Sequence, residues 1–265
     1  MPFFKTHQGV NWHVETVGTN EAVVFIHGFG ASGRWWQAQT DFLHTDYQVI
    51  TLDLPGHGQS SWMPLTLTEM AVDIREILNS LGIAQVALAA SSLGGLVALE
   101  LYRLMPQSIV RICLAGSIPK FARADNYPAG LDIDKIRTLS GQFDGDYASI
   151  LDIFFRSLFT MQERQSDRFK WIRDLRHKEP YPQREALKFF LDILEKADLR
   201  DSLASVVCPV QFITGAEDYI CPRPIMDWVA AHTPHARFDF IEGCGHLPFL
   251  VKAPEYNRLL ADFLN

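Results

Sequence analysis

Short apolar runs alternate along the chain with segments in which apolar residues recur every three or four positions. Six mostly apolar runs of four to six residues predict buried strands at 22–26, 49–52, 86–89, 109–114, 210–214 and 238–241, and the first of them is rich in β-branched side chains. Helical spacing recurs at 67–81, 93–105 and 256–264. This alternation predicts an α/β fold, with a mostly parallel central sheet covered by helices on both faces.

The alternation stops between residues 118 and 203. This segment is charged, and we find no predicted strand in it. Its helical patterns lie at 150–161, 169–175 and 185–197. We therefore expect residues 1–117 and 204–265 to form the α/β core, and residues 118–203 to form a helical cap (lid) subdomain inserted into it.

Composition narrows the class of protein. The net charge of −7 argues against a nucleic-acid binder. The start of the chain has no charged segment followed by an apolar one, and the longest apolar stretch, 86–101, is interrupted by serines and glycines, so we expect no signal peptide and no membrane association. The four cysteines show no C-x-x-C spacing, which favours reduced cysteines and a cytoplasmic protein.

A candidate nucleophile follows the third predicted strand. The chain reads Ala-Ser-Ser-Leu-Gly from Ala90, close to the G-x-S-x-G turn that presents a serine between a strand and a helix. Ala90 and Gly94 are small enough for the two backbones to approach closely, so Ser92 is the candidate; an incidental serine in a buried turn is the alternative. Ser91 fits less well, because Leu93 stands two residues after it.

A serine hydroxyl is a weak nucleophile without an adjacent base. His246 directly follows the last predicted strand in a loop that contains glycines and a proline, and Asp218 follows the strand before it. We expect the Asp218 carboxylate to orient the His246 ring, which in turn takes the proton of Ser92. Glu217 is the competing candidate for the acid.

A second turn predicts the oxyanion hole. His-Gly-Phe-Gly at 27–30 follows the first predicted strand, and a turn of this type supplies a backbone N–H to the reacting oxygen. We expect the N–H groups of Phe29 and Leu93 in this role, and His27 and His57 as structural loop residues. This chemistry needs no cofactor and no metal, and we expect neither.

Together these motifs resemble those of the α/β-hydrolase superfamily, in which the order along the chain is also Ser, Asp, His. They are His-Gly-Phe-Gly at 27, Asp-x-Pro-Gly-His-Gly-x-Ser at 53, Ser-x-Gly-Gly at 92, Gly-x-x-Asp at 215 and Gly-x-Gly-His-x-Pro at 243. The resemblance implies the α/β-hydrolase fold and a serine hydrolase that works through an acyl-enzyme. Haloalkane dehalogenases and epoxide hydrolases of this fold need an aspartate nucleophile, so Ser92 disfavours both.

A closer resemblance is to the pimeloyl-[acyl-carrier protein] methyl ester esterases of biotin synthesis. Residues 191–203 are similar to the segment that returns from the cap in that family, and Arg164-x-x-x-Arg168 is similar to an arginine pair that contacts the carrier protein. Arg156 is a further candidate contact. Phe29 stands where the family usually has Trp. The resemblance implies a carboxylesterase that demethylates pimeloyl-acyl-carrier-protein methyl ester.

The charge pattern agrees with an acidic acyl carrier protein as partner. Between Arg156 and Lys178 there are seven basic and three acidic residues, and Arg164 and Arg168, four apart, are expected on one helix face. A basic patch at the mouth of the pocket, on a lid that roofs Ser92, would steer an acidic carrier towards the site. An ordinary solvated helix is the alternative.

Three other functions stay open. A general small-ester carboxylesterase and a C–C bond hydrolase acting on ring-cleavage products would use the same residues. A catalytically silent receptor on this fold is the alternative outside enzymes.

Overall fold

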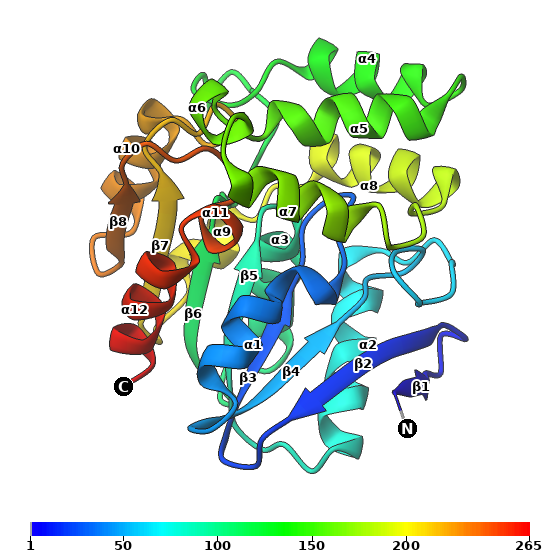
Figure 1. Cartoon of the computed structure of the whole chain (residues 1–265). Helices are drawn as coiled ribbons and strands as arrows, with labels where there is room; N and C mark the ends of the chain where they lie inside the picture. The colour runs from blue at the N-terminus through cyan, green and yellow to red at the C-terminus, as the bar shows by residue number, and fades with distance from the viewer. Residues whose placement is uncertain (1) are drawn as a thin grey trace.

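A computed structural model describes residues 2–265 of the chain. At its centre lies an eight-stranded sheet with the strand order β1-β2-β4-β3-β5-β6-β7-β8 (Figure 1). The strands are β1 (Phe3–Lys5), β2 (Asn11–Val17), β3 (Glu21–Ile26), β4 (Tyr47–Leu52), β5 (Val86–Ser91), β6 (Ile109–Ala115), β7 (Val210–Gly215) and β8 (Arg237–Ile241). Pairing is parallel from β4 through β8 and antiparallel at β1 and β2. The sheet is therefore mostly parallel, as predicted.

Helices cover both faces of the sheet, which confirms the predicted α/β fold (Figure 1). One face carries η1 (Gly33–Trp36), α1 (Gln37–Leu43), α11 (Pro248–Val251) and α12 (Ala253–Leu264), and the other α2 (Leu67–Ser80), α3 (Leu93–Leu104), α9 (Arg200–Ala204) and α10 (Arg223–His232). Side chains of β5 alternate between the two cores: Val86, Leu88 and Ala90 face one, and Ala87 and Ala89 the other. Among helices formed by residues 2–265, none combines the length and apolar character that crossing a bilayer requires.

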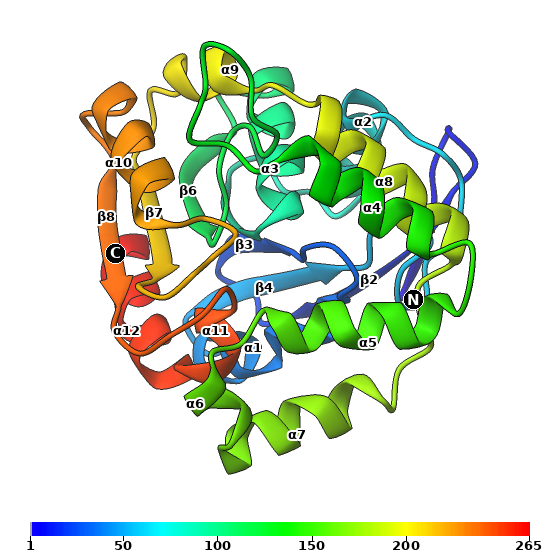
Figure 2. The same cartoon turned by 90° about the horizontal axis from the view of Figure 1, so that it is seen from above.

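The segment between β6 and β7 places five helices over the carboxyl ends of the strands (Figures 1 and 2). These are α4 (Ile133–Gln142), α5 (Tyr147–Ser157), α6 (Met161–Arg164), α7 (Asp167–Arg176) and α8 (Arg184–Lys196). Seen from above, α5 crosses between α7 on one side and α4 with α8 on the other (Figure 2).

Two details of this segment differ from prediction. The single helix expected at 150–161 is divided into α5 and α6, because the Thr160 hydroxyl accepts a hydrogen bond from the backbone N–H of Glu163 (3.1 Å) and so starts a new helix. Helix α4 was not predicted. Only Ile136 among its residues is buried, so its apolar pattern is weak.

The antiparallel strands β1 and β2 were also not predicted. In β2, three consecutive residues from Trp12 are buried and the next three are exposed, so the strand has no alternating pattern. Its anchor is Asp73 of α2, whose Oδ2 accepts hydrogen bonds from Trp12 Nε1 (2.8 Å) and Thr6 Oγ1 (2.7 Å). Burial raises the pKa of Asp73, and the two donors oppose this rise. The first two strands are thus tied to the helix layer beside them.

Replacing Asp73 with Ala should lower the free energy of unfolding by roughly 1–3 kcal/mol, because the buried indole N–H of Trp12 loses its acceptor. Urea titration followed by tryptophan fluorescence measures this loss. Glu76→Ala is the matched control: it lies on the same helix but contacts only the exposed His7, so its loss should be much smaller. Equal losses in the two variants would contradict the anchoring role.

Candidate active site

Ser92 stands at a strained turn between β5 and α3. β5 ends at Ser91, and Ser92 has φ 52° and ψ −123° before α3 begins at Leu93. Within residues 2–265, Ser92 is the one residue other than glycine with positive φ. A Cβ at Gly94 would lie 2.5 Å from the backbone oxygen of Ile26, so only glycine permits this approach of helix to strand. The turn has the shape predicted from the motif.

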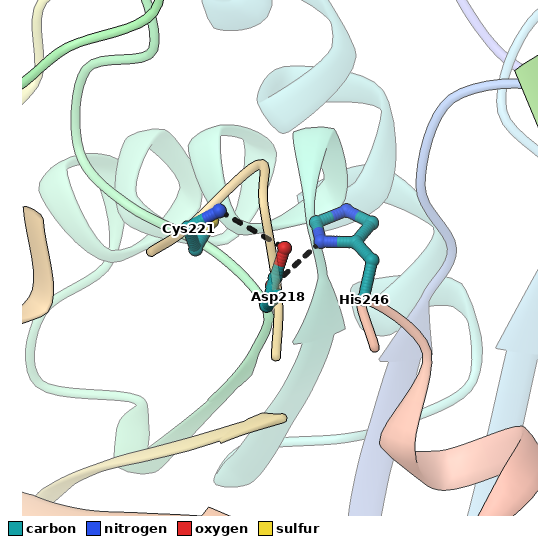
Figure 3. Close-up of side chains that lie close together, drawn as sticks. All are labelled: Asp218, Cys221 and His246. Atoms are coloured by element: carbon teal, nitrogen blue, oxygen red, sulfur yellow. Dashed lines mark hydrogen bonds and ion pairs between the residues drawn. The ribbon is translucent and has the colours of Figure 1, made fainter. Parts of the chain in front are cut away.

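Asp218 and His246 meet beside this turn, each from the loop after a neighbouring parallel strand. His246 Nδ1 lies 2.8 Å from Asp218 Oδ2, and both side chains are buried (Figure 3). The other oxygen, Oδ1, accepts backbone hydrogen bonds from Ile220 (2.8 Å) and Cys221 (3.0 Å). Glu217, the competing candidate, is exposed. The geometry therefore pairs His246 with Asp218.

Cys221 completes a group of potential metal ligands with Asp218 and His246, whose ligand atoms lie within 4.8 Å of one another (Figure 3). Burial, and then the nearby Asp218 carboxylate, raise the pKa of the Cys221 thiol, whereas a metal binds the thiolate. Both oxygens of Asp218 already accept hydrogen bonds from N–H groups. These three residues therefore suit an acid–base pair better than a metal site.

Ser92 and His246 both line a cavity of about 280 Å³. Its walls are mostly apolar. Helices α4, α5 and α8 contribute Ile136, Leu139, Phe154, Leu191 and Leu194. Phe121 comes from the loop before α4, and Phe29 and Ile220 come from loops of the core. Lys135 of α4 also lines the cavity and is exposed, so it marks a place where the cavity meets solvent. An extended apolar group fits such a cavity.

A second cavity, of about 20 Å³, adjoins Ser92 and His246 on the side of η1 and α11. That volume is room for about one water molecule. Trp35, Leu158 and Phe249 are among the residues that line it, together with Ser91. Within residues 2–265, the buried Ser91 hydroxyl has no hydrogen-bond partner. The two cavities differ strongly in the size of group that they admit.

The two backbone N–H groups predicted for the oxyanion hole lie next to Ser92. Leu93 opens α3, so its N–H has no acceptor within the helix. Phe29 lies in the loop after β3, and within the described part of the chain its N–H donates no hydrogen bond to the protein. Gly28 approaches closely as well, since a Cβ there would lie 3.0 Å from Cβ of Ser92. Both N–H groups are thus available to an oxygen bound at Ser92.

Two buried histidines hold the loop of Phe29 in place. His27 Nε2 accepts a hydrogen bond from the backbone N–H of Leu54 (2.9 Å), and His57 Nε2 accepts one from that of Gly30 (3.2 Å). Each Nδ1 lies within hydrogen-bond distance of a backbone carbonyl close in sequence. Burial lowers the pKa of both rings, that of His57 to about 3, so both are neutral near pH 7. They serve as loop residues, as predicted.

The three candidate arginines lie apart from the cavity. Arg156 is on α5, Arg164 ends α6 and Arg168 lies in α7. The prediction that Arg164 and Arg168 share a helix face was wrong, because Ser166 caps α7 and separates the two helices. The helices that line the cavity from above are α4, α5 and α8 of the predicted lid, so of the three arginines only Arg156 lies on one of them.

Two of these arginines are partly engaged in the fold. Arg168 Nε donates to the backbone oxygen of Leu250 (2.8 Å), and its guanidinium lies 4.2 Å from the ring centroid of Trp171. Arg164 Nε donates to the backbone oxygen of Thr160 (3.3 Å). Within residues 2–265, the other guanidinium nitrogens of Arg164 and Arg168 form no hydrogen bond. Sequence reasoning did not single out Lys135, because α4 has too weak a pattern to be predicted.

Comparisons with known proteins agree with this geometry. Residues 23–259 match the α/β hydrolase family. The pimeloyl-[acyl-carrier protein] methyl ester esterase of Nitrosomonas europaea is 32% identical over 241 residues, which are 90% of this chain and 93% of that protein. The enzyme of the same name from Xanthomonas campestris is 28% identical over 254 residues, which are 95% of this chain and 98% of that protein.

Among solved structures, an esterase from Exiguobacterium antarcticum superposes with a TM-score of 0.88 at 25% identity and covers 98% of both chains. A bromoperoxidase from Bacillus anthracis superposes with a TM-score of 0.88 at 26% identity, and the match covers 97% of this chain and 96% of the bromoperoxidase chain. The chain therefore belongs to the α/β hydrolase family and, within it, to the carboxylesterases related to pimeloyl-[acyl-carrier protein] methyl ester esterase. The fold class and the enzyme class predicted from the sequence are confirmed.

The buried neutral histidines predict sensitivity to acid. The pKa of His57 is about 3 in the folded protein, against an ordinary value of 6.5. As the pH falls, the unfolded state therefore binds a proton at His57 at a higher pH than the folded state does. Stability should fall as the pH drops from 6.5 towards 3, by up to about 1.4 kcal/mol per pH unit for this residue. His57→Gln should therefore show a flatter decline of unfolding free energy between about pH 6 and pH 4.

Urea unfolding at a series of pH values measures that slope. His235→Gln is the control, because His235 is exposed and its replacement should leave the slope of the wild type unchanged. A slope for His57→Gln as steep as that of the wild type would show that the buried ring does not govern acid unfolding.

Proposed function

We propose that the chain hydrolyses a carboxylic ester with Ser92 as nucleophile, His246 as general base and Asp218 as the acid that orients it. The observation that carries this proposal is the hydrogen-bonded pair of His246 and Asp218, buried beside a serine at a strained strand-to-helix turn. Ser92 and His246 line the same cavity, so an ester bound there would meet both.

The proposed reaction has two steps. His246 Nε2 takes the proton of the Ser92 hydroxyl as its oxygen attacks the ester carbonyl, and the carbonyl oxygen becomes an oxyanion held by the N–H groups of Phe29 and Leu93. The C–O bond to the alcohol then breaks, and the imidazolium returns its proton to the leaving alcohol. Water, deprotonated by the same histidine, attacks the acyl-enzyme and releases the acid and free Ser92. Asp218 stabilises the imidazolium in both steps.

We further propose that the substrate is the methyl ester of a pimeloyl group carried by an acyl carrier protein, the substrate named for the relatives. The small cavity of about 20 Å³ suits a methoxy-sized leaving group and excludes a bulky alcohol. The apolar cavity of about 280 Å³ suits an extended acyl chain that reaches solvent near Lys135. A carrier attached to the far end of that chain would stay outside.

In this proposal, residues 118–203 act as a cap on a core made of residues 1–117 and 204–265, and the carrier protein docks on the cap. Arg156, Arg164 and Arg168 are the proposed contacts for its acidic surface. The four cysteines are free, which fits a reducing compartment, and we propose the cytoplasm.

Replacing Ser92 with Ala should abolish turnover of a chromogenic short-chain ester, because it removes the hydroxyl that is proposed to form the acyl-enzyme. The variant should unfold at the temperature of the wild type, which shows that the fold is intact. Rapid labelling of the wild type, but not of Ser92→Ala, by an organophosphonate would support the nucleophile. Unchanged ester turnover in the variant would refute it.

The carrier proposal has its own test. Arg164→Glu with Arg168→Glu should lower kcat/KM on the protein-bound methyl ester by roughly tenfold or more at low salt, and should spare small methyl esters. Arg75→Glu with Arg258→Glu is the matched control: it makes the same change in charge on α2 and α12, away from the cap. Equal loss on both substrates, or equal loss in the control, would contradict carrier docking at these arginines.

A further inference from the structure

The loop that carries His246 is held by the cap as well as by the core. The backbone N–H of His246 donates to the oxygen of Leu158 (2.9 Å), and the N–H of the preceding Gly245 donates to Glu163 Oε1 (3.1 Å). A Cβ at Gly245 would lie 2.6 Å from the Leu158 oxygen, so the two segments are in close contact. Two consecutive peptide groups of the loop are thus bound by Leu158, just after α5, and by Glu163 of α6.

Glu163 has an unusual environment for a carboxylate. It is 5% exposed, and its second oxygen, Oε2, accepts a hydrogen bond from the backbone N–H of Thr160 (2.7 Å). Within residues 2–265, no Lys, Arg or His forms an ion pair with it. A buried carboxylate without a cationic partner depends on its hydrogen-bond donors. Here one N–H donor belongs to the cap and the other to the His246 loop, whose Cys244 thiol also interacts with Glu163.

We infer that Glu163 is a positioning residue, which ties the cap to the loop of the general base and keeps the His246 ring in line with Ser92 and Asp218. The inference rests on the proposed function, because it concerns the same histidine. The physical basis of the inference is that Glu163 binds Gly245, the residue directly before His246. A displacement of the Gly245 backbone would therefore also displace the His246 ring. A shift of about 1 Å in a catalytic group can lower the rate roughly a hundredfold.

The chain contains a matched control for this role. Thr66 and Glu69 form the same capping box at the start of α2 that Thr160 and Glu163 form at the start of α6. Glu69 Oε2 accepts from the N–H of Thr66 (2.8 Å), but its side chain is only half-buried, and among residues 2–265 its hydrogen bonds go to Thr66 alone, not to the His246 loop. Loss of Glu69 therefore removes the helix cap alone.

The experiment compares Glu163→Ala and Glu163→Gln with Glu69→Ala and Glu69→Gln in the full chain. The readouts are kcat and KM on a chromogenic methyl ester, the rate of Ser92 labelling by an organophosphonate, and the melting temperature. Glu163→Ala should lower kcat and the labelling rate by roughly tenfold to a hundredfold, with KM changed less than about twofold. Glu163→Gln keeps one acceptor oxygen and should lose less. Both Glu69 variants should keep the kcat of the wild type.

The outcomes separate the inference from the proposed function. If Ser92→Ala is inactive while Glu163→Ala retains the wild-type kcat, or if the Glu69 variants lose as much kcat as the Glu163 variants, the positioning role is overturned and the proposed function stands. If Ser92→Ala retains activity, the proposed function is refuted, and the inference that rests on it is refuted as well. Should Glu163→Ala not fold, Glu163→Gln decides: a kcat equal to that of the wild type overturns the inference.

Discussion

The backbone at Ser92 is the constraint around which the surrounding structure is arranged. A serine with φ 52° costs on the order of 1–3 kcal/mol and persists only where its neighbours hold it. The Ser117 hydroxyl donates to the Ser92 carbonyl (2.6 Å), and the Ser92 N–H donates to the oxygen of Ala115 (3.0 Å). Glycine at 94 lets α3 pack against the end of β3, so the loop that carries Phe29 starts next to Ser92. The same close packing that strains Ser92 therefore places the N–H donors beside it.

The core of the fold could be predicted because a parallel sheet covered on both faces makes its strands continuously apolar. β5 and β7 are buried along their whole length. Ser92 directly follows β5, and Asp218 lies three residues after the end of β7. Parallel strands bring their carboxyl ends to one edge, so Ser92, Asp218 and His246 could be expected near one another although they are far apart in sequence. The pairing of His246 with Asp218 follows from that topology.

The edge strand β2, the lengths of the cap helices and the choice of helices that line the cavity depend on tertiary contacts, which local sequence patterns do not predict. β2 lies near the edge of the sheet, and its anchor, Asp73, is 61 residues away from Trp12. The cap helices are short and half-exposed, so their lengths are decided by single capping residues such as Thr160 and Ser166, and a four-residue spacing of arginines did not imply one helix. Which helices roof the cavity is likewise a matter of tertiary packing.

The segment between β6 and β7 has two physical relations to the region around Ser92 and His246, and they run through different parts of that segment. Helices α4, α5 and α8 supply apolar walls to the cavity beside Ser92. The short segment that follows α5 supplies hydrogen-bond acceptors to the His246 loop. Because Phe154 lines the cavity and Leu158, one turn later, accepts the bond from His246, a displacement of α5 by a bound acyl chain would act on both. The end of α5 therefore connects the wall of the cavity with the loop that carries His246.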